Sequence, residues 1–292
     1  MNVFIFGLGY SALHFARAQA GALQIAGTVT TRAKADALAA QGVETFVFSP
    51  DHCDAGISTR LSEADALLVS IPPGEDGDPV LRTFGDALAA APTTRTIVYL
   101  STVGVYGDHA GAWVDETSRC HPSNARSRER LAAEQGWLDF AAAHGRTAHV
   151  LRLSGIYGPG QNALVNLKNG TARRIVKPGQ VFNRIHVEDI ANAINACLNW
   201  RGGSEIWNVT DDLPAPAQDV VAFAAELMGV EPPPELDFAT AQLSPMARSF
   251  YAECKRVSNR AIKRRLGVRL AYPTYREAMR AMWAMWDTGD GR

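Results

Sequence analysis

The chain alternates short apolar runs with longer segments in which apolar residues recur at helical spacing. The runs predict strands near residues 2–6, 24–30, 44–48, 66–71, 96–101 and 147–153, and the spaced segments predict helices near 11–20, 33–40, 79–91 and 126–143. Continuous apolar strands such as residues 66–69 suit a sheet that is covered on both faces. The pattern therefore predicts an α/β fold with a doubly wound parallel sheet.

The texture of the sequence changes after residue 155, where glycine and proline gather in predicted loops. A further helix is expected from Val187 to Asn199, and it would return the chain to the main domain. We therefore predict two domains that interleave in the sequence. The larger comprises residues 1–155 plus about 181–200, and the smaller comprises about 156–180 plus 201–292.

Composition narrows the class of partner. The 292 residues are 47% hydrophobic and carry a formal net charge of -1, so bulk charge draws the protein neither to nucleic acid nor to an anionic membrane. The cysteines, which form no CxxC or Cys/His cluster, indicate reduced thiols and no metal site; they are Cys53, Cys120, Cys197 and Cys254. The apolar N-terminus lacks a basic leader, and no stretch reaches the roughly 20 apolar residues of a membrane span. We expect a cytoplasmic protein with a small-molecule partner.

A glycine-rich segment stands between the first predicted strand and the first predicted helix. It reads Gly7-Leu8-Gly9-Tyr10-Ser11-Ala12 and matches the GxGxxG/A pattern in its required context. Gly7 would permit the tight turn, Gly9 the close approach of a pyrophosphate, and Ala12 close helix packing. Free N–H groups at the helix start would bind the anion. An ordinary glycine-containing turn is the alternative, but the position at the head of a βαβ series favours a dinucleotide site.

The end of the second predicted strand separates NAD from NADP, because an acidic side chain there would accept the ribose hydroxyls and repel a 2'-phosphate. The segment reads Val29-Thr30-Thr31-Arg32-Ala33-Lys34 and contains no carboxylate. Thr30, Thr31, Arg32 and Lys34 can all donate to a phosphate, so we predict NADP as the cofactor, with NAD less favoured. The alternative is that Arg32 and Lys34 merely start a solvated helix.

Several motifs, in order along the chain, resemble those of the extended and atypical short-chain dehydrogenase/reductases, also called the NAD-dependent epimerase/dehydratase family. Besides the glycine segment, they are YLSTVGVYG at 99–107, LRLSGIYGPG at 151–160, RIHVEDIA at 184–191 and NVTDD at 208–212. The resemblance implies a Rossmann domain for the dinucleotide, a smaller substrate-binding domain, and a homodimer paired through the helices near 79–91 and 126–143. We also assign Ile71, Pro72, Ser101 and Tyr157 to the predicted cofactor site.

The family's catalytic set is only partly present. By its place before Val105-Tyr106-Gly107, Thr102 corresponds to the family's active-site hydroxyl, which can hydrogen-bond a substrate oxygen. The family's acid is a tyrosine followed four residues later by a lysine, yet no tyrosine occurs from 107 to 156 and no lysine from 35 to 167. Counting back from Glu134 puts Arg126 at the tyrosine position and Arg130 at the lysine position. Arg130 could keep the ribose contact, but Arg126 could not deliver a proton near neutrality.

Other residues could take part in catalysis, although each has a structural interpretation. Tyr251 and Lys255 also spell YxxxK, at a spacing that would share a helix face, but they lie about 150 residues past Thr102, and we do not assign them to catalysis. Tyr106 and Tyr157 could border the site as acids, with packing or cofactor support favoured. His186 is expected to be structural. The cap-region candidates, which could equally be solvated, are Asn162, Asn166 and Lys177.

Two functional classes follow from these residues. The first is an NADP-dependent oxidoreductase or epimerase acting on a polar, sugar-like or nucleotide-linked substrate with non-standard catalytic residues. The second is a non-catalytic NADP-binding module or redox sensor that kept the cofactor fold. Retention of Thr102 and of a cap favours the first.

Overall fold

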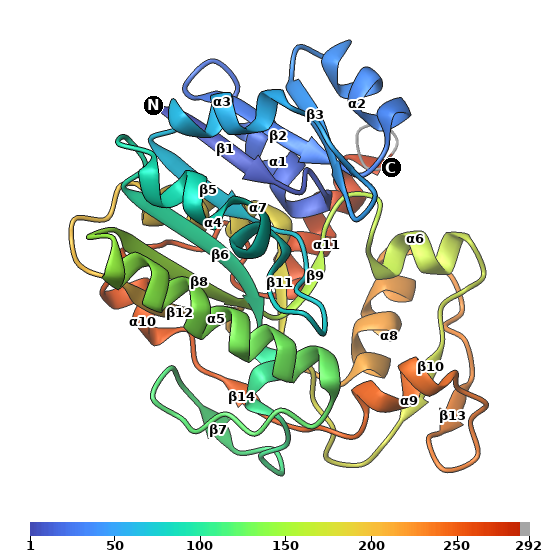
Figure 1. The fold of residues 1–292 in the computed structure, drawn as a ribbon. Coiled ribbons are helices and arrows are strands. Elements are labelled where there is room, and N and C mark those ends of the chain that lie inside the picture. Colours follow the sequence, from blue (N-terminus) through green and yellow to red (C-terminus); the bar gives the residue numbers. More distant parts are fainter. Residues whose placement is uncertain (287–292) are drawn as a thin grey trace. The chain divides into compact units, whose positions relative to one another are not determined.

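The computed structural model describes residues 1–286, which form two compact units. The first unit comprises residues 1–105, 124–152 and 190–207, and the second comprises residues 106–123, 153–189 and the described residues from 208 onward. Each unit is built from segments that are distant in the sequence (Figure 1).

An eight-stranded sheet organises the first unit. Its strand order is β12-β8-β6-β5-β1-β2-β3-β4. The strands are β1 (Asn2–Phe6), β2 (Gln24–Val29), β3 (Glu44–Ser49), β4 (His52–Cys53), β5 (Ala66–Val69), β6 (Thr96–Thr102), β8 (Thr147–Leu153) and β12 (Glu205–Val209). β1, β2, β3, β5 and β6 pair in parallel, whereas β4 runs antiparallel to β3. The predicted α/β fold with a doubly wound parallel sheet of the Rossmann type is confirmed.

The helices of this unit lie between the strands, as the apolar spacing predicted. They are α1 (Tyr10–Ala18), α2 (Arg32–Ala39), α3 (Gly56–Ser62), α4 (Pro79–Ala90) and α5 (Ala125–Ala143). The strands and helices expected from the sequence occur with ends shifted by at most two residues. β12 was not anticipated: its five residues, EIWNV, follow a glycine pair and are too short to show a period.

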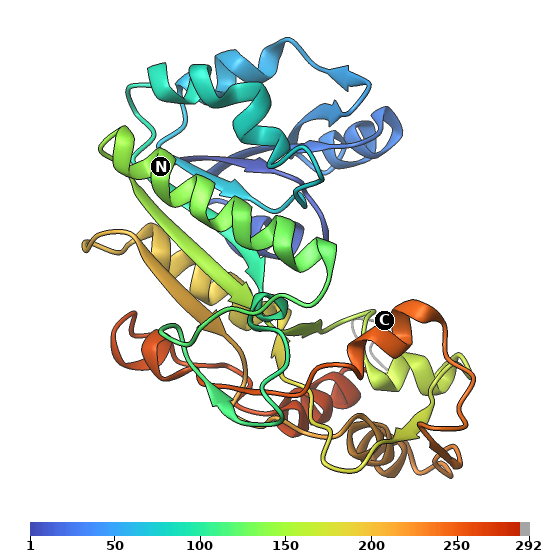
Figure 2. The ribbon, with the colours of Figure 1, turned by 60° about the horizontal axis from the view of Figure 1, so that its bottom comes forward.

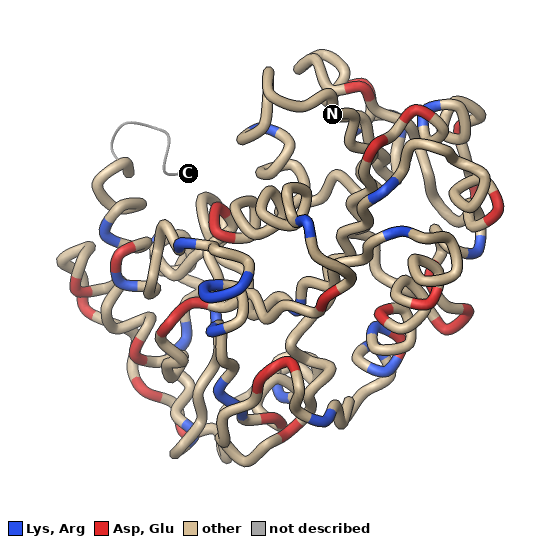
Figure 3. Tube along the Cα trace, turned by 90° about the vertical axis from the view of Figure 1, so that its left-hand side faces the viewer, with Lys and Arg blue, Asp and Glu red and all other residues tan. Residues whose placement is uncertain are grey.

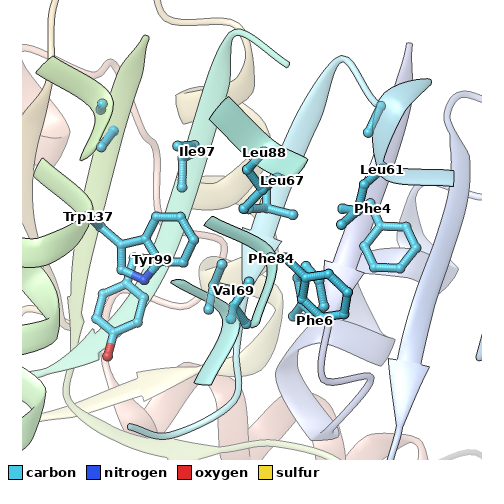
Figure 4. Packing of buried hydrophobic residues seen from close by; sticks show 14 of the residues in the cluster. Phe4, Phe6, Leu61, Leu67, Val69, Phe84, Leu88, Ile97, Tyr99 and Trp137 are labelled. Atoms are coloured by element: carbon cyan, nitrogen blue, oxygen red, sulfur yellow. The ribbon is translucent and has the colours of Figure 1, made fainter. Parts of the chain in front are cut away.

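A large apolar cluster of the first unit lies on one face of the sheet. Apolar side chains of β1, β5, β6 and β8 meet α3, α4 and α5 there (Figure 4). Phe6 and Phe84 have ring centroids 5.1 Å apart, and Tyr99 and Trp137 have centroids 6.4 Å apart. Figure 2 shows α5 running along the sheet over β6 and β8. The Trp137 side chain is fully buried, so its large aromatic surface packs α5 against the sheet.

The second unit is assembled from short strands and helices. The strands are β7 (Trp113–Val114), β9 (Gly155–Tyr157), β10 (Arg174–Val176), β11 (Arg184–His186), β13 (Glu235–Asp237) and β14 (Arg256–Val257), which pair as β10-β13, β11-β9 and β14-β7. The helices are η1 (Val103–Tyr106), which it shares with the first unit, α6 (Ala163–Lys168), α7 (Val187–Leu198), also shared, α8 (Ala217–Met228), α9 (Pro245–Phe250), α10 (Arg260–Arg264) and α11 (Tyr275–Ala284). Side chains of α6, α8 and α11 form its main core.

The unit boundaries differ from the predicted domains in four segments. Residues 106–123, 153–155 and 181–189 cluster with the second unit, and 201–207 cluster with the first. The cause is pairing between distant short strands: β7 pairs with β14, β11 pairs with β9, and β12 joins the large sheet. Pairings of two or three residues leave no periodic signal in a sequence.

Charge is distributed along the chain in both signs. Figure 3 shows Lys and Arg interspersed with Asp and Glu. Within residues 1–286, no helix has the length and apolar character to cross a membrane. The same residues contain no group of three or more His, Cys, Asp or Glu that could hold a metal ion.

His149 gives the first unit a pH-dependent stability. The imidazole is fully buried, and the Trp207 indole N–H donates to its Nδ1 at 3.3 Å. Burial lowers the pKa of His149 to about 4. Since the unfolded group titrates near its ordinary value of about 6.5, the unfolded state binds more protons between the two values. The stability that neutral His149 contributes is therefore fully present above the unfolded-state pKa of about 6.5. It is lost as the pH falls toward the folded-state pKa of about 4.

We expect a His149→Asn variant, whose amide oxygen can accept from Trp207, to lack this dependence. Between about pH 7.5 and about pH 5, wild type should lose about 2 kcal/mol more unfolding free energy than the variant. Urea denaturation at both pH values measures the two losses. Comparison with the variant is necessary because buried carboxylates also titrate, and equal losses would contradict a neutral, buried His149.

Candidate functional site

The chain turns sharply at Gly7, directly after β1. Gly7 has a φ of +92°, and a Cβ added there would lie 2.5 Å from Cγ2 of Ile71. The turn is tied to β2, because the Gly7 N–H donates to Thr28 Oγ1 at 3.0 Å and the Leu8 N–H donates to Thr28 O at 2.8 Å. The fold itself therefore requires glycine at position 7.

Gly9 has a different reason to be glycine. Its φ of -82° and ψ of -166° are open to any residue, and an added Cβ would meet no atom within 4 Å. Gly9 is the N-cap of α1 but has no side chain to bond the N–H groups of the first turn. Such N–H groups form a natural anion site. Packing within the protein does not require glycine at position 9. The absence of a side chain there instead leaves space for an external anion to approach the helix start.

The other predicted cofactor residues of the glycine segment begin α1. Ser11 and Ala12 are buried against the sheet, and partial burial raises the pKa of Tyr10 to about 12. Ile71 and Pro72 follow β5, with Ile71 beside the Gly7 turn and Pro72 exposed. Because β1, β2 and β5 are parallel neighbours, these residues gather where the three strands end. This edge is where open α/β sheets bind their ligands.

The segment that follows β2 starts helix α2. Thr31 is the N-cap of α2, and its hydroxyl accepts from the Lys34 N–H at 3.4 Å. Thr30 is exposed, as is the side chain of Arg32. The cap gives Thr31 a structural role, whereas Thr30 and the side chain of Arg32 are accessible to a ligand.

A carboxylate that the sequence analysis missed holds Arg32. Arg32 Nη2 donates to both oxygens of Asp54, at 2.7 and 2.9 Å. His52 Nε2 lies 2.8 Å from Asp54 Oδ1, and the Val47 N–H donates to Oδ2 at 2.7 Å. The Val47 N–H, then His52, then Arg32 hold the pKa of Asp54 below its ordinary value. No local signal pointed to Asp54, because it reaches Arg32 through the β3–β4 hairpin.

Ser101 lies in a buried polar network at the end of β6. Its hydroxyl donates to Glu134 Oε1 at 2.5 Å, and Arg152 donates to Glu134 Oε2 through Nη2 at 2.7 Å and through Nε at 3.2 Å. All three side chains are buried. The network joins β6, α5 and β8. Because the Ser101 hydroxyl donates its hydrogen to Glu134, the predicted cofactor contact of Ser101 would have to use its oxygen or its backbone.

Thr102, the predicted active-site hydroxyl, stands at the last position of β6. Its Oγ1 accepts from the Gly104 N–H at 3.1 Å, and the side chain is partly exposed. A Cβ on Gly104 would lie 3.0 Å from Ser127 Oγ and 3.3 Å from Thr102 Oγ1. The buried hydroxyl of Ser127, which the sequence analysis missed, therefore flanks the same glycine. It could have been found by its place between Arg126 and Arg130 of α5.

The two arginines that the sequence analysis placed at the family's catalytic positions differ in environment. Arg126 is exposed in the first turn of α5. Arg130 is partly buried, and its Nη1 donates to the Leu100 carbonyl at 2.6 Å. The guanidinium carbon also lies 5.6 Å from the centroid of the Tyr99 ring. Arg130 is therefore fixed against β6, two residues before Thr102, whereas Arg126 faces solvent.

In the second unit, Tyr106 is fully buried. Its hydroxyl donates to Asn208 Oδ1 at 2.8 Å, and Asn208 Nδ2 donates to the Ser258 carbonyl at 3.2 Å. A role of Tyr106 as an acid would require this bond to be exchanged for one to the substrate. The geometry agrees with packing, which the sequence analysis favoured.

Tyr157 is also buried, but its hydroxyl has no hydrogen-bond partner among the described residues. Burial raises the pKa of Tyr157, and the charge of Asp211 raises it further. Burial likewise raises the pKa of Asp211 to about 7, against the opposing Leu213 N–H and Arg184 charge. Tyr157 thus keeps its proton throughout the neutral range and can donate it in a hydrogen bond.

His186 lies between aromatic rings in the second unit. Its ring centroid is 5.3 Å from that of Tyr157 and 4.3 Å from that of Tyr272. Three residues later, buried Asp189 accepts from the N–H groups of Ala271 and Tyr272 at 2.6 and 3.1 Å. These contacts join α7 to the C-terminal segment and agree with the structural role expected for His186.

The cap-region candidates have mixed environments. Asn162 is buried and caps α6, because its Oδ1 accepts from the Val165 N–H at 3.0 Å. Asn166 is exposed. Lys177 donates to the Tyr251 carbonyl, and its Nζ lies 5.4 Å from the Phe238 ring centroid. Asn162 and Lys177 thus have structural partners, and Asn166 remains open to solvent.

Tyr251 and Lys255 do not share a helix face. α9 ends at Phe250, and Tyr251 is its C-cap, so the helical spacing considered for this YxxxK segment is wrong. The Tyr251 ring stacks on Phe238, with centroids 5.0 Å apart. Lys255 Nζ donates to the Gly107 carbonyl at 2.7 Å and to Glu253 at 2.6 Å. Both side chains serve the packing of the second unit.

Comparison with known proteins adds to this geometry. The profile of the NAD dependent epimerase/dehydratase family matches residues 83–210. Protein YeeZ of Escherichia coli K12 is 28% identical over 256 residues, which cover 80% of this chain and 85% of YeeZ.

Solved structures match over nearly the whole chain. A functionally unknown conserved protein from Silicibacter pomeroyi is 45% identical, with a TM-score of 0.87 over 98% of this chain and 99% of that one. UDP-glucuronic acid 4-epimerase from Bacillus cereus, in complex with NAD, has a TM-score of 0.76 at 15% identity, over 99% of both chains. The second likeness shows the fold alone. Residues 83–210 therefore carry the profile of the NAD dependent epimerase/dehydratase family, in a chain whose fold is shared end to end with solved structures.

Proposed function

We propose that the protein is an NADP-dependent oxidoreductase or epimerase that acts on a polar, sugar-like or nucleotide-linked substrate. The observation that carries the proposal is the open space at Gly9 above an uncapped helix start, in a chain that keeps a hydroxyl at Thr102. The solved epimerase from Bacillus cereus binds NAD, which supports a nicotinamide cofactor in this fold. Arg32 supports the choice of NADP, because it can donate to a 2'-phosphate.

Different residues of the first unit would bind the cofactor and orient the substrate. The first turn of α1 would bind the pyrophosphate, and Arg32 with Thr30 would meet the 2'-phosphate. Bound NADP would supply a nicotinamide that accepts or donates hydride. Thr102 would orient the substrate oxygen, with the buried hydroxyl of Ser127 on the other side of Gly104. Arg130, fixed on β6, would supply positive charge where the family has a lysine.

A second function, a non-catalytic NADP-binding module, is favoured by one observation. The resemblance puts Arg126 and Arg130, and no tyrosine or lysine, at the positions of the family's acid and its partner. The two functions share the cofactor site and differ in turnover. Cofactor oxidation or reduction across a panel of nucleotide-linked sugars and polar carbonyls separates them.

The two glycines of the turn should respond differently to substitution. Gly9→Asp places a carboxylate where the pyrophosphate would lie, so we expect it to abolish dinucleotide binding in calorimetry while the melting temperature changes little. Gly7→Ala should instead destabilise the fold by about 1–3 kcal/mol, because alanine is strained at positive φ and meets Ile71. A folded Gly9→Asp protein with unchanged NADPH affinity would remove the proposed phosphate loop.

Cofactor choice should depend on Arg32. Wild type should bind NADPH more tightly than NADH, and Arg32→Ala should weaken NADPH binding by about 10-fold, the value of one charge-assisted contact of about 1.5 kcal/mol. The affinity for NADH should stay within about twofold, since NADH has no 2'-phosphate. Titration of both cofactors against both proteins is the measurement. Equal losses for the two cofactors would show that Arg32 does not read the phosphate.

Thr102 and its neighbour Ser101 form a matched pair for the chemical step. Thr102→Val keeps the shape but removes the hydroxyl, and we expect turnover to fall by about 10²-fold to 10³-fold with little change in stability. Ser101→Ala should mainly lower stability, because it removes the shorter of the two hydrogen bonds to a buried oxygen of Glu134. Steady-state kinetics and urea denaturation of both variants give the comparison. Full turnover in Thr102→Val would exclude this hydroxyl from catalysis.

A further inference from the structure

The end of β2 has no carboxylate of its own, but Asp54, which follows β4 of the neighbouring β3–β4 hairpin, lies beside it. Val47 of β3 pairs with Val29 at the end of β2. Asp54 returns along the β3–β4 hairpin to the same point, where its N–H donates to the Val47 carbonyl at 3.0 Å and its Oδ2 accepts from the Val47 N–H at 2.7 Å. The backbone of β3 thus fixes the Asp54 carboxylate, which is only 18% exposed.

The lone pairs of this carboxylate are already in use. Oδ1 bonds Arg32 Nη2 at 2.7 Å and His52 Nε2 at 2.8 Å, and Oδ2 bonds Val47 N and Arg32 Nη2, the latter at 2.9 Å. A carboxylate offers about four acceptor positions. Asp54 therefore has little capacity left to accept a ribose hydroxyl, and its effect on a cofactor is that of a fixed negative charge.

Arg32 brings that charge close to any phosphate it binds. Both of its bonds to Asp54 come from Nη2, so Nη1 and Nε are the nitrogens with which it would meet a phosphate. The phosphate would then stand about one guanidinium width from the carboxylate. Arg32 and Asp54 together present a dipole to the phosphate instead of a single positive charge.

We propose that Asp54 is a specificity-determining residue whose carboxylate weakens binding of the 2'-phosphate at Arg32 and so narrows the preference for NADP over NAD. This rests on the proposed function, in which Arg32 meets the phosphate. Repulsion between the Asp54 carboxylate and the 2'-phosphate, one guanidinium width apart near the protein surface, should weaken the affinity for NADPH by about threefold to tenfold.

The test is Asp54→Asn, with Asp51→Asn as the matched control. The asparagine oxygen can still accept from the Val47 N–H, but its NH2 group cannot accept from Arg32, so the guanidinium is released and the charge is removed. Asp51 lies three residues earlier on the exposed tip of the same hairpin, and its change removes the same charge. Calorimetric titration with NADPH and with NADH, at low salt and fixed pH, gives the four affinities.

In Asp54→Asn, NADPH should bind about threefold to tenfold more tightly, and NADH should stay within about twofold, which also shows that the site is intact. The gain should shrink at high salt, and Asp51→Asn should show at most a small part of it. Unchanged or weaker NADPH binding in Asp54→Asn, or an equal gain in Asp51→Asn, overturns the proposal.

The Arg32→Ala background separates this proposal from the function on which it rests. Adding Asp54→Asn to Arg32→Ala should still tighten NADPH binding, because the repulsion is removed even without the arginine. If Arg32→Ala alone leaves the NADPH to NADH ratio unchanged while Asp54→Asn raises it, the phosphate-reading role of Arg32 fails and the Asp54 charge stands. Failure of wild type to bind either cofactor overturns both.

Discussion

The buried ion pair between Glu134 and Arg152 determines where the candidate catalytic residues lie. The two side chains are 2% and 4% exposed, and Ser101 completes the network from β6. Taking two charges out of water is expensive, so such a pair adds little net stability, yet loss of one partner costs about 3–5 kcal/mol. Because only one arrangement of β6, α5 and β8 satisfies all three groups, the network fixes the register of α5 on the sheet.

The register of α5 on the sheet determines which side chains lie near Thr102. Glu134 lies one turn after Arg130 on α5, so the arginine is directed at the Leu100 carbonyl, and the first turn of the helix brings Ser127 to Gly104. Arg126 and Arg128 occupy this first turn without an acidic residue, although the helix dipole there favours negative charge. The helix start thus concentrates positive charge next to a hydroxyl pair, which suits the binding of an anionic or strongly polar group more than proton transfer.

The parts of the site that are local in the sequence could be predicted from it. The turn at Gly7 and the helix start at Gly9 follow from one strand, one glycine pattern and one helix. Asp54 could not be found in the same way, because its contact with Arg32 spans 22 residues and depends on an antiparallel hairpin of two residues per strand. The ion pair of Glu134 with Arg152 likewise exists only once β8 has been placed in the sheet.

The difference between local and long-range contacts also explains why the second unit differs from what the sequence predicted. Helices such as α8 and α11 carry apolar faces, but the pairings that gather 106–123 and 184–186 into this unit involve strands of two or three residues. Tyr251 and Lys255 have the spacing of a helix pair, yet α9 begins at a proline and ends before Tyr251, so spacing alone gave the wrong geometry. A motif is informative only where the backbone that carries it is known. Tyr251 and Lys255 match YxxxK only as letters, whereas Arg130 lies on a helix whose position on the sheet is fixed by Glu134.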